Sequence, residues 1–169
     1  MRRLIICVIA LFIFSACEDE VAPVVVASSY GAFPFSFSTL DLHGNPVTEE
    51  SLGQKELFFV YFWTTWCPSC VRAIPGLEEL AQEFSDRVGF LTLLGDFTAN
   101  QATAISITEG TSFITVDANI DDFFYLMELL DSGFVPTSAI IGAEGMIGEQ
   151  IVGGSIDRFR AAIEEVLAE

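Results

Sequence analysis

The chain has 169 residues, which suits one domain after a short N-terminal segment and excludes a multidomain protein. Apolar residues make up 51% of the sequence and 16 residues are phenylalanine, so we expect a folded chain with a sizeable core. Asp and Glu number 24 against 7 Lys and Arg, which gives a formal net charge of -17. Because such a charge repels a phosphate backbone, nucleic acid is excluded as a partner.

The first seventeen residues have the layout of an export signal. Two arginines precede an unbroken apolar run from Leu4 to Phe14, and two small residues follow before Cys17. The run is shorter than the roughly 20 residues that a membrane-spanning helix needs, so we expect a signal peptide over residues 1–16. The sequence Phe-Ser-Ala-Cys resembles a bacterial lipobox, although Phe14 stands where Leu is more usual. It predicts that Cys17 becomes the lipidated first residue of the mature protein.

Two other signals fit the same segment. A plain secretory signal or an uncleaved anchor would leave Cys17 unmodified, and the twin arginines would suit a Tat signal less well than the strongly apolar core suits a Sec signal. Residues 18–32 are small and acidic without a sustained period, so residues 17–32 are interpreted as a tether and 33–169 as the domain. Cys67 and Cys70 are then the two remaining thiols of the exported protein. Export places them outside the cytosol, where disulfides can form and persist.

The first half of the domain alternates turn signals with apolar runs. Residues 35–42 have a strand-like pattern that ends in the turn residues 41–46, which predicts an opening hairpin. Residues 57–63, all apolar or aromatic, predict a central strand covered on both faces. Residues 74–84 have apolar side chains at helical spacing and predict an amphipathic helix that is bent at Pro75.

The second half continues the alternation of strands and helices. The patterns predict strands over 88–94 and 112–116, a hairpin over 135–141 and 146–152, a weak helix over 100–108, a helix over 120–130 between Asn119 and Gly133, and a last helix after Ser155. This order predicts an α/β fold with helices on both faces of a sheet.

The strongest chemical signal is Trp66-Cys67-Pro68-Ser69-Cys70, where the central strand meets the amphipathic helix. Unpaired N–H groups and the macrodipole at a helix N-terminus favour a thiolate, so Cys67 is the predicted nucleophile. Cys70 lies one helical turn further on and is placed to attack a mixed disulfide on Cys67. Pro68 suits the first helical position because no N–H is needed there.

FWTTWCPSC after a buried strand, followed later by Val135-Pro136-Thr137, resembles the thioredoxin superfamily. Within it, residues 33–169 are similar to TlpA-like, membrane-tethered thiol-disulfide oxidoreductases. The resemblance implies a thioredoxin-like α/β fold, with a central mixed sheet flanked by helices and an N-terminal hairpin extension. It also implies that Pro136 is a cis-proline facing the cysteines and that Val135 offers its backbone to a substrate. Trp66 and Pro68 would border the same substrate.

Two positions depart from the family pattern. Tyr61 lies six residues before Cys67, where thioredoxins carry a buried Asp that helps to move the proton of the resolving thiol. Ala73 lies three residues after Cys70, where many TlpA-like reductases carry Glu. Because neither acid is present, we predict that water or Tyr61 provides the proton route.

The resemblance further implies an activity. The protein would exchange thiols and disulfides with other proteins, without a bound cofactor, on a membrane surface facing the periplasm or the outside. It would act as a reductant that receives electrons from a membrane thiol relay. Its clients would be an apocytochrome c, a copper-centre protein or a misoxidised exported protein.

Other types of cysteine site match this sequence less well. Zinc needs further ligands, and the exported chain offers only His43 beyond the pair. Haem attachment needs His directly after Cys70, where Val71 stands, and a peroxiredoxin motif at Thr64-x-x-Cys67 would need Pro in place of Val60. A non-catalytic binding module with a structural disulfide remains an alternative.

Overall fold

The computed structural model describes residues 39–47, 53, 55–96, 100–117, 132–142 and 145–168, without the side chains of Thr39 and 145–149. The expected signal peptide, Cys17, the tether and the helix expected over 120–130 lie outside the described residues. Within the part that is described, no helix is long and apolar enough to cross a membrane.

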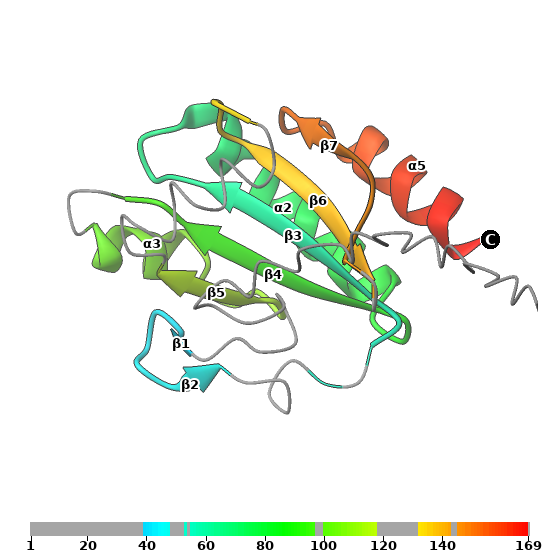
Figure 1. The fold of residues 1–169 in the computed structure, drawn as a ribbon. Helices are drawn as coiled ribbons and strands as arrows, with labels where there is room; N and C mark the ends of the chain where they lie inside the picture. The colour runs from blue at the N-terminus through cyan, green and yellow to red at the C-terminus, as the bar shows by residue number, and fades with distance from the viewer. Residues whose placement is uncertain are drawn as a thin grey trace, which may run out of the picture.

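A five-stranded sheet with the order β5-β4-β3-β6-β7 forms the centre of the fold (Figure 1). The strands β3 and β4 pair in parallel, as do β4 and β5, whereas β6 pairs antiparallel with both β3 and β7. The expected mixed sheet is therefore confirmed. The strands are β3 (Leu57–Trp63), β4 (Val88–Leu94), β5 (Ile114–Asp117), β6 (Thr137–Gly142) and β7 (Gly145–Val152).

The central strand β3 separates two apolar cores. All seven of its residues are buried, which confirms the prediction from its unbroken apolar run. Alternate side chains enter opposite cores because successive residues of a strand point to opposite faces. Phe59 lies on the helix side, with its ring centroid 5.1 Å from that of Phe159, while Phe58 and Val60 belong to the core on the other face.

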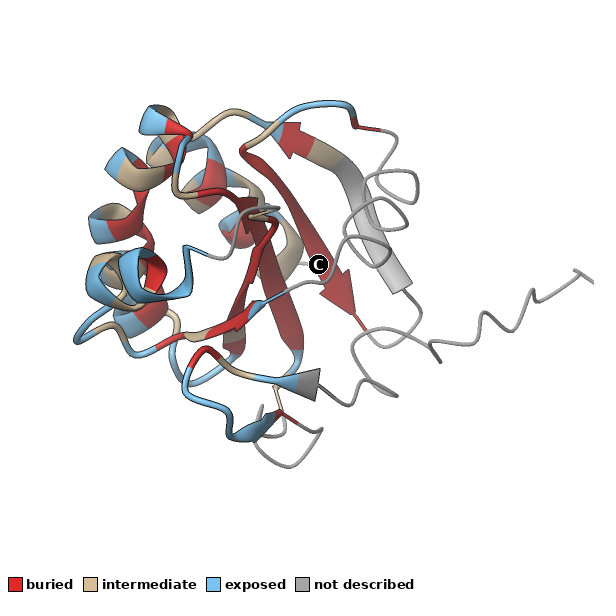
Figure 2. Ribbon diagram, turned by 90° about the vertical axis from the view of Figure 1, so that its left-hand side faces the viewer, coloured by how far each residue is buried: buried red, intermediate tan, exposed pale blue. Residues whose placement is uncertain are grey.

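Three described helices contribute to the core on one face of the sheet: α2 (Pro68–Glu83), α3 (Gln101–Ile107) and α5 (Ile156–Leu167). Figure 2 shows helices to one side of a sheet whose strands are largely buried. The helices α2 and α5 are in contact where Gly76 faces Ile156, since a Cβ built on Gly76 would lie 2.5 Å from the Ile156 side chain. This packing holds α2 against α5.

The opening hairpin is present, and residues 35–38 of its expected first strand lie outside the described residues. The strand β1 (Thr39–Leu40) pairs antiparallel with β2 (Pro46–Val47). Leu42 was expected to lie in a strand, yet it lies in the turn, buried, with its N–H bonded to the Thr115 carbonyl at 3.1 Å. The reason is the Asp41 carboxylate, which accepts two backbone N–H groups within the turn and so starts it early.

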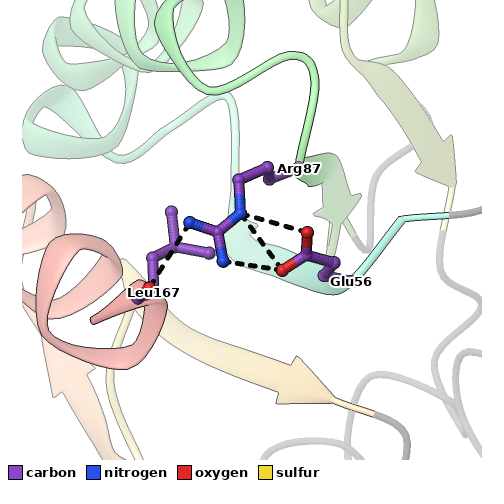
Figure 3. Close-up of polar contacts among 3 residues, drawn as sticks. All are labelled: Glu56, Arg87 and Leu167. Atoms are coloured by element: carbon purple, nitrogen blue, oxygen red, sulfur yellow. Dashed lines mark hydrogen bonds and ion pairs between the residues drawn. The ribbon is translucent and has the colours of Figure 1, made fainter. Parts of the chain in front are cut away.

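Arg87 joins three segments of the chain by hydrogen bonds (Figure 3). These segments meet at the start of β3, whereas the cysteines follow the other end of that strand. The Arg87 guanidinium binds both carboxylate oxygens of Glu56, at the start of β3, and its Nη1 donates to the Leu167 carbonyl at 3.3 Å. The second bond satisfies a carbonyl in the last turn of α5 that has no partner within its own helix.

Candidate active site

The two cysteines lie where β3 gives way to α2. Cys67 is the N-cap of α2 and Pro68 is its first residue, so the helix begins inside the motif. The structure holds Cys67 and Cys70 as a disulfide, with 5.3 Å between their Cα atoms. Cys67 is 6% exposed and Cys70 is fully buried. Of the two sulfurs, that of Cys67 is therefore the more accessible to another molecule.

Polar hydrogens surround the Cys67 sulfur. The backbone N–H of Cys70 donates to Cys67 Sγ at 3.2 Å, and the Ser69 hydroxyl lies 3.3 Å from the same atom. When the disulfide is reduced, these donors and the N-terminus of α2 favour the charged form of the Cys67 thiol over the neutral form. Cys70 has no comparable exposure.

A loop before β6 lies against the cysteines. The Val135–Pro136 peptide bond is cis, and the Val135 carbonyl oxygen lies 3.8 Å from Cys67 Sγ. The Pro136 carbonyl accepts a hydrogen bond from Gly153 N–H at 2.8 Å, which anchors the loop to the end of β7. Val135 and Pro136, which the resemblance placed beside the cysteines, are thus brought to Cys67.

Hydroxyl groups brace this loop from within. Ser132 Oγ and Thr137 Oγ1 lie 2.7 Å apart, and Thr137 Oγ1 also donates to the Phe134 carbonyl at 2.7 Å. The Phe134 side chain is 70% exposed, and Phe134 directly precedes Val135, whose carbonyl oxygen lies 3.8 Å from Cys67 Sγ. Trp66 is also well exposed, at 59%. Phe134 was not expected from the sequence, although its position directly before Val135-Pro136 could have indicated it.

The positions that lack the family's acids are both buried. The Tyr61 hydroxyl donates to the Cys70 carbonyl at 3.1 Å, and burial raises the pKa of Tyr61 well above its ordinary value of 10.0. Ala73 is buried in α2, and a Cβ built on Gly154 would lie 3.3 Å from the Cβ of Ala73. Tyr61 therefore carries a proton at neutral pH and is placed to hold the Cys70 backbone.

Asp96 was not expected from the sequence, and His43 was given no role. Asp96 follows β4 and accepts hydrogen bonds from Thr65. Its position just after a buried strand could have indicated that it lies beside the motif. His43 is exposed in the hairpin turn. Among the residues that the structure describes, no group of three or more His, Cys, Asp or Glu could hold a metal ion.

Comparisons with known proteins agree with this geometry. The thioredoxin family model matches residues 43–117. A thiol:disulfide interchange protein of the thioredoxin family from Chlorobium tepidum TLS has a solved structure that superposes with a TM-score of 0.63, at 25% identity, over 76% of this chain and 91% of that one. The chain has a thioredoxin-like fold.

Two proteins with sequences similar to this chain are named as thiol-disulfide oxidoreductases. The thiol-disulfide oxidoreductase ResA of Bacillus thuringiensis is 29% identical over 119 residues, which cover 70% of this chain and 66% of ResA. The sporulation thiol-disulfide oxidoreductase A of Bacillus subtilis is 26% identical over 124 residues, 72% of this chain and 73% of that protein. These relatives support a thioredoxin-like oxidoreductase, and the match spans slightly less than two thirds of ResA.

Proposed function

We propose that the protein is a thiol-disulfide oxidoreductase that exchanges the Cys67–Cys70 pair with cysteines of other proteins. The observation that carries the proposal is the disulfide itself, placed at the N-terminus of α2 with the cis-Pro136 loop 3.8 Å from Cys67 Sγ. A purely structural bridge needs neither a sulfur surrounded by polar donors nor a loop that lies against it.

The exchange proceeds in two steps. In the reduced protein the Cys67 thiolate attacks one sulfur of a substrate disulfide, forms a mixed disulfide and releases the other substrate sulfur as a thiolate. Cys70 then loses its proton to water and attacks Cys67 Sγ. The Cys67–Cys70 disulfide closes, and the second substrate sulfur leaves. Two electrons have passed to the substrate, and its two thiolates take up protons from water.

The substrate chain binds across the motif and the cis-proline loop. Trp66 and Pro68 are exposed beside the more accessible sulfur, and Val135 presents its backbone there. An extended segment next to the substrate cysteine can contact all three, while Pro136 fixes the direction of the loop. This arrangement selects polypeptides over small disulfides.

Location and direction complete the proposal. The apolar segment before Cys17 exports the chain, and lipid on Cys17 tethers it to a membrane that faces the periplasm or the outside. In that setting the protein acts as a reductant, supplied with electrons by a membrane thiol protein and serving clients such as an apocytochrome c, a copper-centre protein or a misoxidised exported protein. The support is the signal layout and the TlpA-like motif.

A second candidate is a binding module in which the disulfide is structural. It is favoured by one observation: Tyr61 and Ala73 are buried at the two positions where the family pattern that the motif resembles has an acid. Neither side chain can take the proton of Cys70 as a carboxylate would.

Reduction of insulin by dithiothreitol separates the two candidates. The wild-type protein is expected to accelerate precipitation of the insulin chains, and Cys67→Ser is expected to abolish the acceleration. Cys70→Ser should retain at most a small fraction of it, because the mixed disulfide is no longer resolved from within. Failure of the wild type, or equal rates for wild type and Cys67→Ser, would reject the exchange reaction and favour the binding module.

A further inference from the structure

Asp96 reaches from the end of β4 to the loop that leads into the cysteine motif. One carboxylate oxygen accepts the backbone N–H of Thr65 at 2.8 Å, and the other accepts the Thr65 hydroxyl at 2.5 Å. The neighbouring Gly95 N–H donates to the Trp63 carbonyl at 2.9 Å, so the segments that follow β4 and β3 stay paired just beyond the two strands. Both oxygens of one side chain thus hold a single residue, two positions before Cys67.

This contact controls a short turn. The chain must leave β3 at Trp63 and begin α2 at Pro68, and within that turn the Cys67 N–H is bonded to the Thr64 carbonyl at 3.3 Å. A carboxylate that accepts two hydrogen bonds makes charge-assisted contacts, which are stronger and more directional than neutral ones. Asp96 therefore restricts where the turn can place Cys67 relative to Cys70.

Asp96 also brings a negative charge to the edge of the sheet that carries the dithiol. The strands β5, β4 and β3 are adjacent and parallel, so the residues that follow their carboxyl ends lie along one edge. Asp117 ends β5, Asp96 follows β4, and Cys67 follows β3. Burial raises the pKa of Asp117, and the nearby charge of Asp96 raises it further, because two carboxylates at this edge repel each other.

A fixed negative charge disfavours a second one nearby. It opposes the thiolate-stabilising effect of the α2 N-terminus and the Cys70 N–H, and so destabilises the reduced protein relative to the disulfide. We propose that Asp96 is a positioning residue for the dithiol, which holds the turn through Thr65 and whose charge makes the reduced Cys67–Cys70 pair a stronger reductant. This inference rests on the proposed function for its biological meaning.

The effect of the Asp96 charge is tested on the reduced protein by measuring the rate of Cys67 alkylation as a function of pH. The modified residue is identified by peptide mass. Asp96→Asn keeps the shape and one acceptor but removes the charge. We expect the half-maximal pH to fall, so that the thiolate fraction below it rises by about twofold to tenfold. The matched control is Asp86→Asn, an exposed aspartate before β4, at the opposite end of the same strand, which should leave the profile unchanged.

The positioning is tested separately at Thr65. Thr65→Val removes the hydrogen bond from the Thr65 hydroxyl and leaves the charge of Asp96, so the pH of half-maximal Cys67 alkylation should stay the same. The equilibrium constant of disulfide formation against glutathione should fall by about twofold to tenfold. Thr65→Ser restores the hydroxyl and should restore the constant. These variants also test the inference if Asp96→Asn does not fold.

Several results would overturn the inference. They are an unchanged pH profile in Asp96→Asn, an equal shift in Asp86→Asn, or a Thr65→Val protein that matches the wild type in its glutathione equilibrium. None of these measurements needs a protein client. Failure of the insulin assay with an intact Asp96 effect would therefore reject the proposed function alone, and the reverse result would reject only the role of Asp96.

Discussion

The phenolic hydroxyl of Tyr61 donates a hydrogen bond to the backbone carbonyl of Cys70, with 3.1 Å between the two oxygens. Tyr61 is fully buried in β3, and its ring packs edge-on against Phe159 at a centroid distance of 6.0 Å. The bond joins the central strand to the first turn of α2. Because burial keeps the phenol protonated, Tyr61 is a poor base for the proton of Cys70.

The first prediction concerns Tyr61→Phe. The ring stays in the core, but the Cys70 carbonyl loses its partner, so we expect the free energy of unfolding to fall by about 1 kcal/mol. The pH dependence of insulin reduction should not change, because a protonated phenol does not titrate in the working range. Denaturant unfolding and a pH series of the assay check both parts. A displaced pH profile would make Tyr61 the proton route.

The second prediction is a loss of stability in alkali. The pKa of Tyr61 is higher in the folded chain than its ordinary value of 10.0, so the folded state keeps a proton that the unfolded state releases. The contribution of Tyr61 is complete below pH 10 and declines as the pH rises above it. The wild type should therefore lose stability faster than Tyr61→Phe between pH 9 and pH 11, when the disulfide is intact. Parallel curves would contradict the assignment.

The third prediction concerns the close approach of Gly154 to both halves of the site. A Cβ at this position would lie 3.0 Å from the Ser69 carbonyl oxygen and 3.6 Å from Pro136 Cγ. Gly154→Ala should push the first turn of α2 away from the cis-proline loop, lowering stability by about 1–3 kcal/mol and slowing insulin reduction.

Gly133→Ala is the control for that substitution. Gly133 lies in the loop that carries Pro136, but a Cβ there would meet nothing within 4 Å. Thermal unfolding and insulin turnover of this variant should match the wild type. If the two alanine variants behave alike, the close approach at Gly154 does not matter.

The fourth prediction concerns Phe134. Its side chain is 70% exposed, so Phe134→Ser should fold normally. Because an exposed aromatic residue beside Val135 can bury apolar surface of a bound polypeptide, reduction of insulin should slow by about threefold to tenfold. Reduction of a small disulfide such as oxidised glutathione should not change. The control is Leu40→Ser, which removes another exposed apolar side chain, in the hairpin. Slowing in both variants would show a general surface effect.

Much of the fold could be predicted from local patterns. The unbroken apolar run of residues 57–63 specified a strand buried on both faces, and helical spacing after Pro68 specified α2. These signals are strong because burial on both faces, or on one helical stripe, requires a fixed apolar period. The turn at Leu42 was predicted less well, since its early start depends on hydrogen bonds to one side chain, Asp41.

The site was predictable only where it is a contiguous motif. The disulfide and the cis bond before Pro136 were expected from short sequences that resemble a family. Asp96 and Phe134 were not, because their roles come from contacts between segments far apart in the chain. Asp96 meets Thr65 across 31 positions, and the loop of Phe134 meets Cys67 across 68. Local sequence patterns do not reveal contacts between such distant segments.

The most direct test of the central claim is to trap the mixed disulfide. Cys70→Ser and Cys67→Ser proteins are incubated with a peptide that contains an activated disulfide, and each adduct is located by peptide mass. We predict a stable adduct on Cys67 in Cys70→Ser, and a much slower reaction at the buried Cys70 in Cys67→Ser. Equal rates in the two variants, or no adduct on Cys67, would contradict Cys67 as the attacking thiol and with it the exchange mechanism.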